Sequence, residues 1–393
     1  MCPSPPSRRS AHVAAQVTHT IGLSPFLRRS LLGAALFFGA GLLLVHPDSA
    51  PVFRSNPIVG PRCDRLASPA GSDDSGDGGR SRPYRTLTRL DASLAPGQTG
   101  CLRSGTYGGL DATHTLSRDG SPTAPITVTA YPKEQPTVVG WVDIEASYTV
   151  LSGLQIDGSN RLYVPERPDP TCAHRVSRGL TINGTHDVFE HNDFSQSAAT
   201  LRGNGIGVGF NRAADETTLR YNRIHDVGGC RAFDHLIYLA AGKHVQIYGN
   251  WLWNDPHGWG VQVFPKPSGA HIYANVVDRA GSGFFLGASP ATSDNRLDHN
   301  VVVNSTGLPD AGLRTGGVAV SSYWSVNAGT GTGNSFDHND SFANSGGLAQ
   351  TTGVALDANT TANPHLADTE AHDYRVPTSS AVAGWGLWDG GSP

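Results

Sequence analysis

The chain has 393 residues, which is long enough for one elongated domain behind a targeting segment. Its formal net charge of −4 and its pI near 6.4 exclude a typical nucleic-acid-binding surface, because such a surface needs a basic stripe. With 48 Gly, 26 Pro and only 16% charged residues, the composition favours a fold with many tight turns.

The chain begins with a segment that has the pattern of an export signal. Arg28 and Arg29 precede an apolar run over residues 31–45, and small or turn residues follow through Ala50. An apolar run of this length suits a signal peptide better than a membrane span of about 20 residues. The Arg-Arg-Ser-Leu-Leu order also suits a twin-arginine signal. We expect residues 1–50 to direct export to the cell surface or the medium, with an uncleaved N-terminal anchor as the alternative.

The cysteines agree with export. Cys2 lies in the leader, which leaves Cys63, Cys101, Cys172 and Cys230 in the rest of the chain, and four cysteines allow three pairings. Disulfides are the default in an oxidising compartment. We expect Cys63–Cys101 and Cys172–Cys230, because each pair brackets one segment. The alternative, a zinc site, is disfavoured since the sequence contains no CxxC.

Residues 57–110 contain SPAGSDDSGDGGRSRPYRTLTRL and LAPGQTGCLRSGTYGG. This order resembles the opening of many secreted right-handed parallel β-helix proteins of the pectin-lyase-like fold. GVQVFPKPSGAHIYANVVDRAGSGFFLG and GTGNSFDHNDSFANSG resemble interior coils of that family, and NPHLADTEAHDYRVPTSSAVAGWG resembles its closing segment. The resemblance covers nearly all of the chain after the leader. It implies a short helix, from about Thr86 to Leu94, that caps the first coil.

A strand-like run that closes on Asn recurs through the second half of the chain. The spacing between copies is 25 to 39 residues, which is typical of a solenoid whose units bury their apolar faces only by stacking. We predict an all-β, right-handed parallel β-helix of about eight coils over residues 111–345, between an N-terminal cap within 57–110 and a C-terminal cap over 346–393. The recurring residues are Asn192, Asn222, Asn250, Asn275, Asn300 and Asn339.

These asparagines are expected to be structural. At a corner between strands Asn tolerates the left-handed backbone conformation, and stacked copies can hydrogen-bond through their side-chain amides. Leu154 stands where the preceding coil would carry its Asn, so we expect the ladder to begin one coil later.

A second set of strands lies between the Asn-bearing ones, at 204–210, 235–241, 260–265, 283–288 and 317–322. Each alternates apolar with small or polar residues, as a strand with one buried face must. The alternation predicts an outward row of Gly207, Tyr238, Gln262, Phe285 and Ala319. We predict a sugar-binding platform here, unless a long loop such as 160–178 covers it. Its members would be Tyr238, Gln262, Phe264 and Phe285, with Tyr323 and Trp324 on the next coil.

Ionisable residues cluster at the ends of these strands. Lyases and C5-epimerases that act on uronic acids must neutralise a carboxylate, remove the adjacent C5 proton and protonate an oxygen or the opposite face, and His, Lys, Arg and Tyr perform such steps. We predict Arg231 or Lys266 as the carboxylate ligand, His235 or His257 as the base and Tyr238 as the acid. The alternative is that His235 and His257 are ordinary surface or turn residues without a catalytic role.

Two short motifs bear on these assignments. Asp255-Pro256-His257 resembles the DPH core of the alginate-epimerase motif, although here it precedes its strand. The second motif is the Asp-His pair at 234–235. The same pair recurs at 298–299 and 337–338, so it is partly a feature of the repeat. The catalytic prediction therefore requires His235, His257 and Lys266 to converge in one open groove.

The sequence favours an exported carbohydrate-active protein that acts on acidic polysaccharide by β-elimination or C5-epimerisation. A non-catalytic glycan-binding or structural surface protein is the alternative. Hydrolysis is disfavoured, because the only adjacent acidic pair, Asp73-Asp74, lies outside the coils. No cofactor or metal is predicted; calcium stays open, without a ligand set. We expect a monomer that binds polysaccharide but no nucleic acid, with membrane contact only through an uncleaved anchor.

Overall fold

The computed structural model describes residues 62–161, 176–196, 204–212, 214–227, 234–287, 289–308, 316–322 and 330–391. They belong to one compact unit over 58–393. The export segment, the cysteines at 172 and 230, Arg231, Tyr323 and Trp324 lie outside the described residues. Within the described part, no helix has the length and apolar character to cross a membrane.

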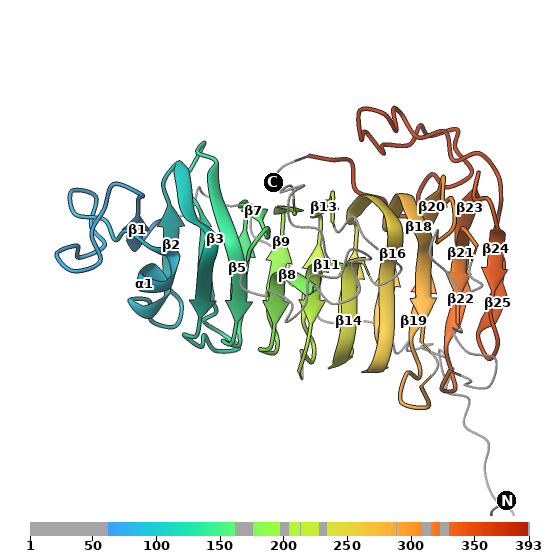
Figure 1. The fold of residues 1–393 in the computed structure, drawn as a ribbon, viewed down its shortest axis with the longest axis horizontal. Helices are drawn as coiled ribbons and strands as arrows, with labels where there is room; N and C mark the ends of the chain where they lie inside the picture. Colours follow the sequence, from blue (N-terminus) through green and yellow to red (C-terminus); the bar gives the residue numbers. More distant parts are fainter. Residues whose placement is uncertain are drawn as a thin grey trace, which may run out of the picture. The chain divides into compact units, whose positions relative to one another are not determined.

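The strands pair in parallel and form two large sheets. Successive strands of sheet A lie side by side along the long axis of Figure 1. Sheet A has eleven strands among the described residues: β1 (Arg65–Ala67), β2 (Thr99–Leu102), β4 (Ile126–Ala130), β6 (Thr149–Ser152), β9 (Val188–Glu190), β12 (Thr218–Arg220), β15 (Gln246–Tyr248), β17 (His271–Tyr273), β19 (Arg296–Asp298), β22 (Ser335–Asp337) and β25 (Ala355–Asp357).

Sheet B contains two kinds of strand. A short strand follows each Asn corner, and a long strand comes next along the chain. In β16 and β18 the two are continuous, so one bent strand pairs with a short neighbour first and a long neighbour afterwards. The strands are β3 (Gly105–Leu116), β5 (Pro136–Ile144), β7 (Gln155–Asp157), β8 (Val176–Ile182), β10 (Asp193–Ser195), β11 (Asn204–Phe210), β13 (Arg223–His225), β14 (His235–Lys243), β16 (Trp251–Ser268), β18 (Val276–Leu286), β20 (Val301–Val303), β21 (Val318–Ser321), β23 (Asp340–Phe342) and β24 (Gly347–Gln350).

This arrangement is a parallel β-helix, as the repeats predict. The strands of sheet A from β4 to β22 bury a central residue, and these residues stack in register through the core: Ile247, Ile272, Leu297 and Phe336 are all fully buried. The last strand, β25, differs, because its Leu356 is 43% exposed. The described part of sheet A has eleven strands, against the expected eight or so coils. The strands β1 and β2 precede the recurring motif, and β25 closes on Asn359, a copy of the motif that the prediction did not count.

The expected N-terminal helix is present as α1 (Leu87–Ala92), at the same end of the stack as β1 and β2 (Figure 1). Thr86 caps it by accepting a hydrogen bond from the N–H of Arg89, an ordinary role for a threonine at this position. Leu87 and Leu90 are buried in the main core. The apolar side of α1 thus packs onto the first strands.

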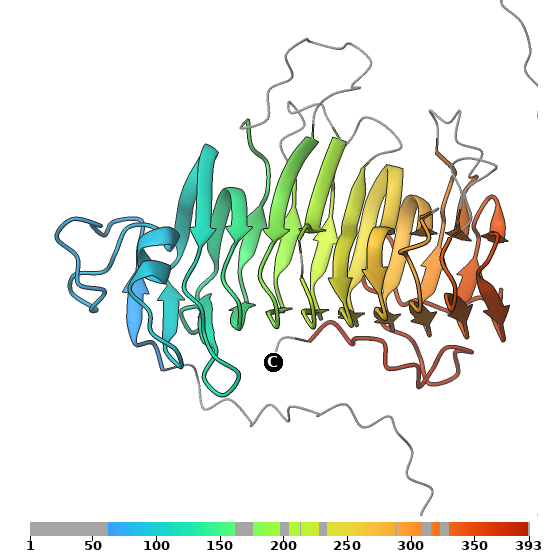
Figure 2. The ribbon, with the colours of Figure 1, turned by 90° about the horizontal axis from the view of Figure 1, so that it is seen from below.

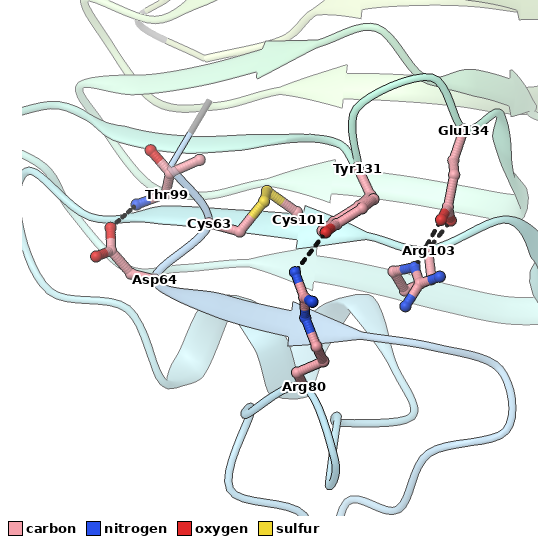
Figure 3. The surroundings of a disulfide bond; sticks show 8 residues. All are labelled: Cys63, Asp64, Arg80, Thr99, Cys101, Arg103, Tyr131 and Glu134. Carbon is pink, nitrogen blue, oxygen red and sulfur yellow. Dashed lines mark hydrogen bonds and ion pairs between the residues drawn. A yellow bond between two sulfur atoms is a disulfide. The ribbon is translucent and has the colours of Figure 1, made fainter. Parts of the chain in front are cut away.

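The Cys63–Cys101 disulfide is confirmed, with its Cα atoms 5.5 Å apart. It joins the residue before Asp64 to strand β2, and Figure 3 shows it beside Arg80 and Tyr131. The Arg80 guanidinium donates to the Tyr131 hydroxyl at 2.9 Å. The predicted partner pair, Cys172–Cys230, lies outside the described residues.

The asparagine ladder is also confirmed. The Oδ1 atom of Asn250 accepts the backbone N–H and the side-chain amide of Asn222, both at 3.0 Å. The same pattern runs from Asn192 to Asn339 and then adds Asn359. Leu154 donates its N–H to Asn192 at 3.1 Å, so the ladder does begin one coil after it.

One expectation about the corners is wrong. The residue before each ladder asparagine takes the left-handed conformation, with φ of 55° at His191 and 53° at Ala274, whereas no ladder asparagine has a positive φ. The preceding residue makes the turn. The asparagine that follows it then directs its amide along the stack, where the next asparagine can accept its hydrogen bonds.

The C-terminal segment was expected to cap the last coil. Its first part instead adds β24 and β25 to the sheets, and residues 358–391, called the tail here, return along the short strands of sheet B (Figures 1 and 2). Arg223 on β13 donates to the Gly390 carbonyl at 3.3 Å. The tail therefore covers a side of the helix. Tail residues Tyr374, Val382 and Trp388 pack against Trp251, Trp253, Val276, Val301 and Val303.

Candidate functional site

The outward face of the long strands carries the row that the sequence predicted, with a corrected register at both ends. The observed row is Gly209, Tyr238, Gln262, Phe285 and Ser321. The predicted members Gly207 and Ala319 are wrong, because the chain bends at the start of these strands. Two successive residues, Leu236 and Ile237, are consequently both in the main core, as is Ala319, which shifts the outward row by two residues.

Aromatic rings stack across adjacent coils of this face. The His235 ring lies 5.0 Å from that of Tyr238 and 5.5 Å from that of Trp259, centroid to centroid. Trp259 in turn lies 5.0 Å from Phe285, and Phe264 and Leu308 pack around this pair. Trp259 was missed from the sequence, although its place two residues after His257 in the same strand would have indicated it.

The prediction of an open platform is wrong for two of its members: Gln262 is 3% exposed and Phe285 is fully buried. The predicted base His235 is also buried, with 4% exposure. Tyr238 and Phe264 are half-buried. The alternative that the aromatics are covered agrees with this burial, although most of the loop proposed to cover them lies outside the described residues.

Buried polar atoms without a hydrogen-bond partner concentrate on this face. Folded proteins leave few such atoms, and a cluster of them calls for a specific explanation. Seven of the eighteen found in the described part of the chain lie here. They are His235 Nδ1, both carboxylate oxygens of Asp255, His257 Nδ1, Trp259 Nε1, Gln262 Oε1 and Ser321 Oγ, and we call these groups the orphan cluster.

Burial shifts the pKa values of His235 and Asp255, both in the orphan cluster, in opposite directions. It lowers the pKa of His235 to about 3, so the imidazole is neutral near pH 7. It raises the pKa of Asp255 well above its usual value, and the neighbouring Asp234 carboxylate adds to the rise. The N–H groups of Gly258 and His257 oppose it, although neither forms a hydrogen bond of normal geometry to Asp255. The patch thus combines an imidazole that burial keeps neutral near pH 7 with a carboxyl group whose pKa burial raises.

Stacking of the coils also brings two carboxyl groups together. Asp234 and Asp255 are both fully buried, and the backbone N–H of Trp259 donates to the backbone carbonyl of Asp234 at 3.0 Å. The expectation that the coils contain no clustered carboxylates is therefore wrong. The two residues are 21 positions apart in sequence, and their proximity depends on the length of one coil.

The predicted convergence of three cationic groups fails for Lys266. Lys266 is exposed and pairs with Ala241, six residues beyond His235 along β14. At about 3.3 Å per residue, this places it on the order of 20 Å from His235. His257 does belong to the patch, since Trp259, two residues later, pairs with His235. Arg231 is outside the described residues.

Among the described residues, no group of three or more His, Cys, Asp or Glu side chains is arranged to hold a metal ion.

Comparison with solved structures identifies the fold. Pectate lyase Pel9A matches with a TM-score of 0.55 and 15% identity, over 82% of this chain and 89% of that one. A rhamnogalacturonan lyase matches at TM-score 0.50 and 14% identity, over 82% and 99%. A glycoside hydrolase matches at TM-score 0.54 and 9% identity, over 80% and 99%. The chain is thus a parallel β-helix of the pectin-lyase-like fold.

At the level of sequence, no protein-family model and no curated protein matches the chain. The identities to the solved structures are so low that they define the fold alone. The assignment of function consequently depends on the residues of the orphan cluster.

Proposed function

We propose that this chain is a carbohydrate-active protein that acts on an acidic polysaccharide at the outward face of β14, β16, β18 and β21. The observation that supports the proposal is the orphan cluster, because its buried donors and acceptors have no hydrogen-bond partner among the residues that the structure describes. A sugar supplies hydroxyl groups that both donate and accept. Trp259 Nε1 can donate to such a ligand, Gln262 Oε1 can accept, and Ser321 Oγ can do either.

The proposed reaction begins with removal of the C5 proton of a uronate. Neutral His235 takes this proton, and Asp255, whose pKa burial raises, or Tyr238 supplies one. In β-elimination the released electron pair forms the C4–C5 double bond, the C4–O bond breaks, and the leaving oxygen receives the proton. In C5-epimerisation the carbanion is instead protonated on the opposite face. The pattern of residues 1–50 supports export as part of this proposal.

Two other functions have support of their own. A non-catalytic glycan-binding role is favoured by the burial of His235, Gln262 and Phe285, which limits access for a polymer. Hydrolysis is favoured by the Asp234–Asp255 pair, since acid and base carboxyl groups cleave glycosidic bonds.

The test incubates the purified chain with polygalacturonate and with alginate. Ultraviolet absorbance follows the unsaturated product of elimination, and NMR in D₂O follows deuterium entering C5. We expect product from the native sequence and a loss of at least about 100-fold in His235→Asn and Asp255→Asn. His244→Asn is the matched control, because His244 is exposed and lies in the turn between β14 and β15.

Each result separates the candidates. Full activity in His235→Asn removes that residue from the mechanism. New reducing ends without absorbance or deuterium exchange favour hydrolysis, and binding without any product favours the non-catalytic role. Because the His235 pKa is about 3, the rate should show no acidic limb near pH 6.5 that arises from this residue.

A further inference from the structure

A second group of chemically versatile side chains lies on the outer face of sheet A. It comprises Asp298 and His299 at the end of β19, Asp337 and His338 at the end of β22, and two residues that contact Asp298. The full set, called the histidine face, is His271, Arg296, Asp298, His299, Asp337 and His338. The orphan cluster is on the other sheet, so the histidine face is separate from the site of the proposed function.

Asp298 positions two imidazole rings at once. Its Oδ1 atom lies 2.5 Å from Nε2 of His271, and its Oδ2 atom lies 2.7 Å from Nδ1 of His299. Burial favours the neutral carboxyl group, but the hydrogen bonds from both histidines and the charge of Arg296 lower the pKa of Asp298 overall. The carboxylate is thus ionised and already fully bonded, and His299 rather than Asp298 is available to a ligand.

The next coil repeats the arrangement. Asp337 pairs in register with Asp298, and its Oδ2 atom lies 3.5 Å from Nδ1 of His338. The rings of His299 and His338 stack with centroids 5.4 Å apart and planes 15° apart. Their side chains are 34% and 50% exposed, and within the described residues neither Nε2 atom has a partner. Two equivalent nitrogens are therefore presented about one coil, or about 4.8 Å, apart, close to the length of one sugar unit.

The tail adds an aromatic wall to this face. The Trp385 ring meets the His299 ring edge to face, with centroids 5.4 Å apart and planes at 89°. Trp385 is half-buried, whereas Trp388 is buried against Trp251 and anchors this part of the tail. A hydrogen-bonding row beside a part-exposed tryptophan offers both contacts that a sugar ring uses, hydroxyl pairing and packing on its apolar side.

Charge selects the class of glycan. Three carboxylates, from Asp298, Asp337 and Asp357, lie in one row on successive coils. Arg296 is the one cation bonded to this row within the described residues. The three carboxylates and Arg296 together carry a formal net charge of −2, which repels a polyuronate. A purely structural role would explain the Asp–His hydrogen bonds but does not explain the outward nitrogen of His299 beside Trp385 or its repeat on the next coil at His338.

We propose that the histidine face and Trp385 form a second glycan-binding site, which takes a neutral polysaccharide lying along the axis of the coils. His299 and His338 accept hydrogen bonds from sugar hydroxyls at Nε2, and Trp385 packs against a ring. Asp298 and Asp337 act as positioning residues.

The experiment measures retardation of the full chain in native gels that contain soluble neutral glycans (arabinoxylan, xyloglucan, galactomannan or mixed-linkage β-glucan) and, in parallel, polygalacturonate, all at about pH 7.5. The variants are Trp385→Ala and the double variant His299→Asn/His338→Asn. Asparagine suits the latter because both positions have φ near 55°. His244→Asn is the control, since His244 is exposed and has a φ of 53°.

We expect at least one neutral glycan to retard the native chain, with the affinity falling about tenfold or more in both site variants and staying unchanged in the control. Substitutions in the orphan cluster should leave this retardation intact, which separates the two proposals. The inference is overturned if no neutral glycan is bound or if the site variants bind as the control does. It is equally overturned if these substitutions abolish binding of polygalacturonate instead.

Discussion

The asparagine ladder and the orphan cluster lie in the same coils, a short distance apart along the chain. They differ in how completely their buried polar groups are hydrogen-bonded. In the ladder, the Asn250 side chain makes four hydrogen bonds, to Asn222 twice, to Leu219 and to Asn275. In the orphan cluster, Asp255 and Gln262 are as deeply buried, but their side-chain oxygens have no hydrogen-bond partner in the described part of the chain.

The difference separates architecture from function. A buried amide whose hydrogen bonds are complete stabilises the fold, whereas a buried polar atom without a partner costs free energy that some other advantage must offset. Substitutions in the two regions should therefore have opposite consequences for stability and for activity.

The largest effect is expected within the ladder. Asn250→Ala removes the acceptor of the Asn222 backbone N–H and the side-chain donor to the Leu219 carbonyl, while Asn275 Oδ1 keeps only the backbone N–H of residue 250. We expect the free energy of unfolding to fall by about 3–5 kcal/mol, measured by denaturant titration. Asn359→Ala is the control: it ends the ladder where water can replace it, and we expect a loss below about 1 kcal/mol. Equal losses at both positions would contradict a cooperative ladder.

An effect of the opposite sign is expected in the orphan cluster. Because the pKa of Asp255 is raised in the folded state, its contribution to stability declines as pH rises from its unfolded value, about 3.9, toward the folded value. Asp255→Asn removes this decline. We expect the variant to be about 1–3 kcal/mol more stable than the native sequence at pH 7 and equal to it near pH 3, by thermal unfolding across that range. A uniform loss at every pH would mean that the carboxyl group is structural.

The smallest effect on stability is expected at Gln262. Its Oε1 atom has no partner, so Gln262→Leu should change the free energy of unfolding by less than about 1 kcal/mol. The same change should weaken binding of the acidic glycan about tenfold, because it removes an acceptor from the proposed site. Gln246→Leu, on the outer face of β15, is a matched control that should leave this binding intact. A large loss of stability with no change in binding would place Gln262 with the ladder.

The histidine face shows which part of a site a sequence pattern can predict and which part it cannot. Asp298-His299 and Asp337-His338 are visible as repeated pairs, and the same repetition argued against giving either of them a role. Their meaning depends on Trp385, which is 86 residues beyond His299 and reaches it only because the tail returns along the helix. Nothing in the local sequence near Trp385 indicates that return.

Several features followed from the sequence alone: the parallel β-helix, the ladder from Asn192 onward and the Cys63–Cys101 bond. They share a physical basis, because a strand period, an amide at each corner and a pair of cysteines that brackets one segment are patterns that repeat or pair at short range. The helix α1 was expected from the family resemblance. The central register of the long strands, from Tyr238 through Gln262 to Phe285, was also predictable, since it depends only on which alternate residues are apolar.

The tertiary structure decided the rest. It placed Lys266 about 20 Å from His235, shifted both ends of the outward row, buried Gln262 and Phe285, and brought Asp234 next to Asp255. Each of these depends on where a strand bends and on how many residues one coil contains. Both quantities are set by packing among coils, so a repeat motif determines the fold of this protein while the stacking of its coils determines its chemistry.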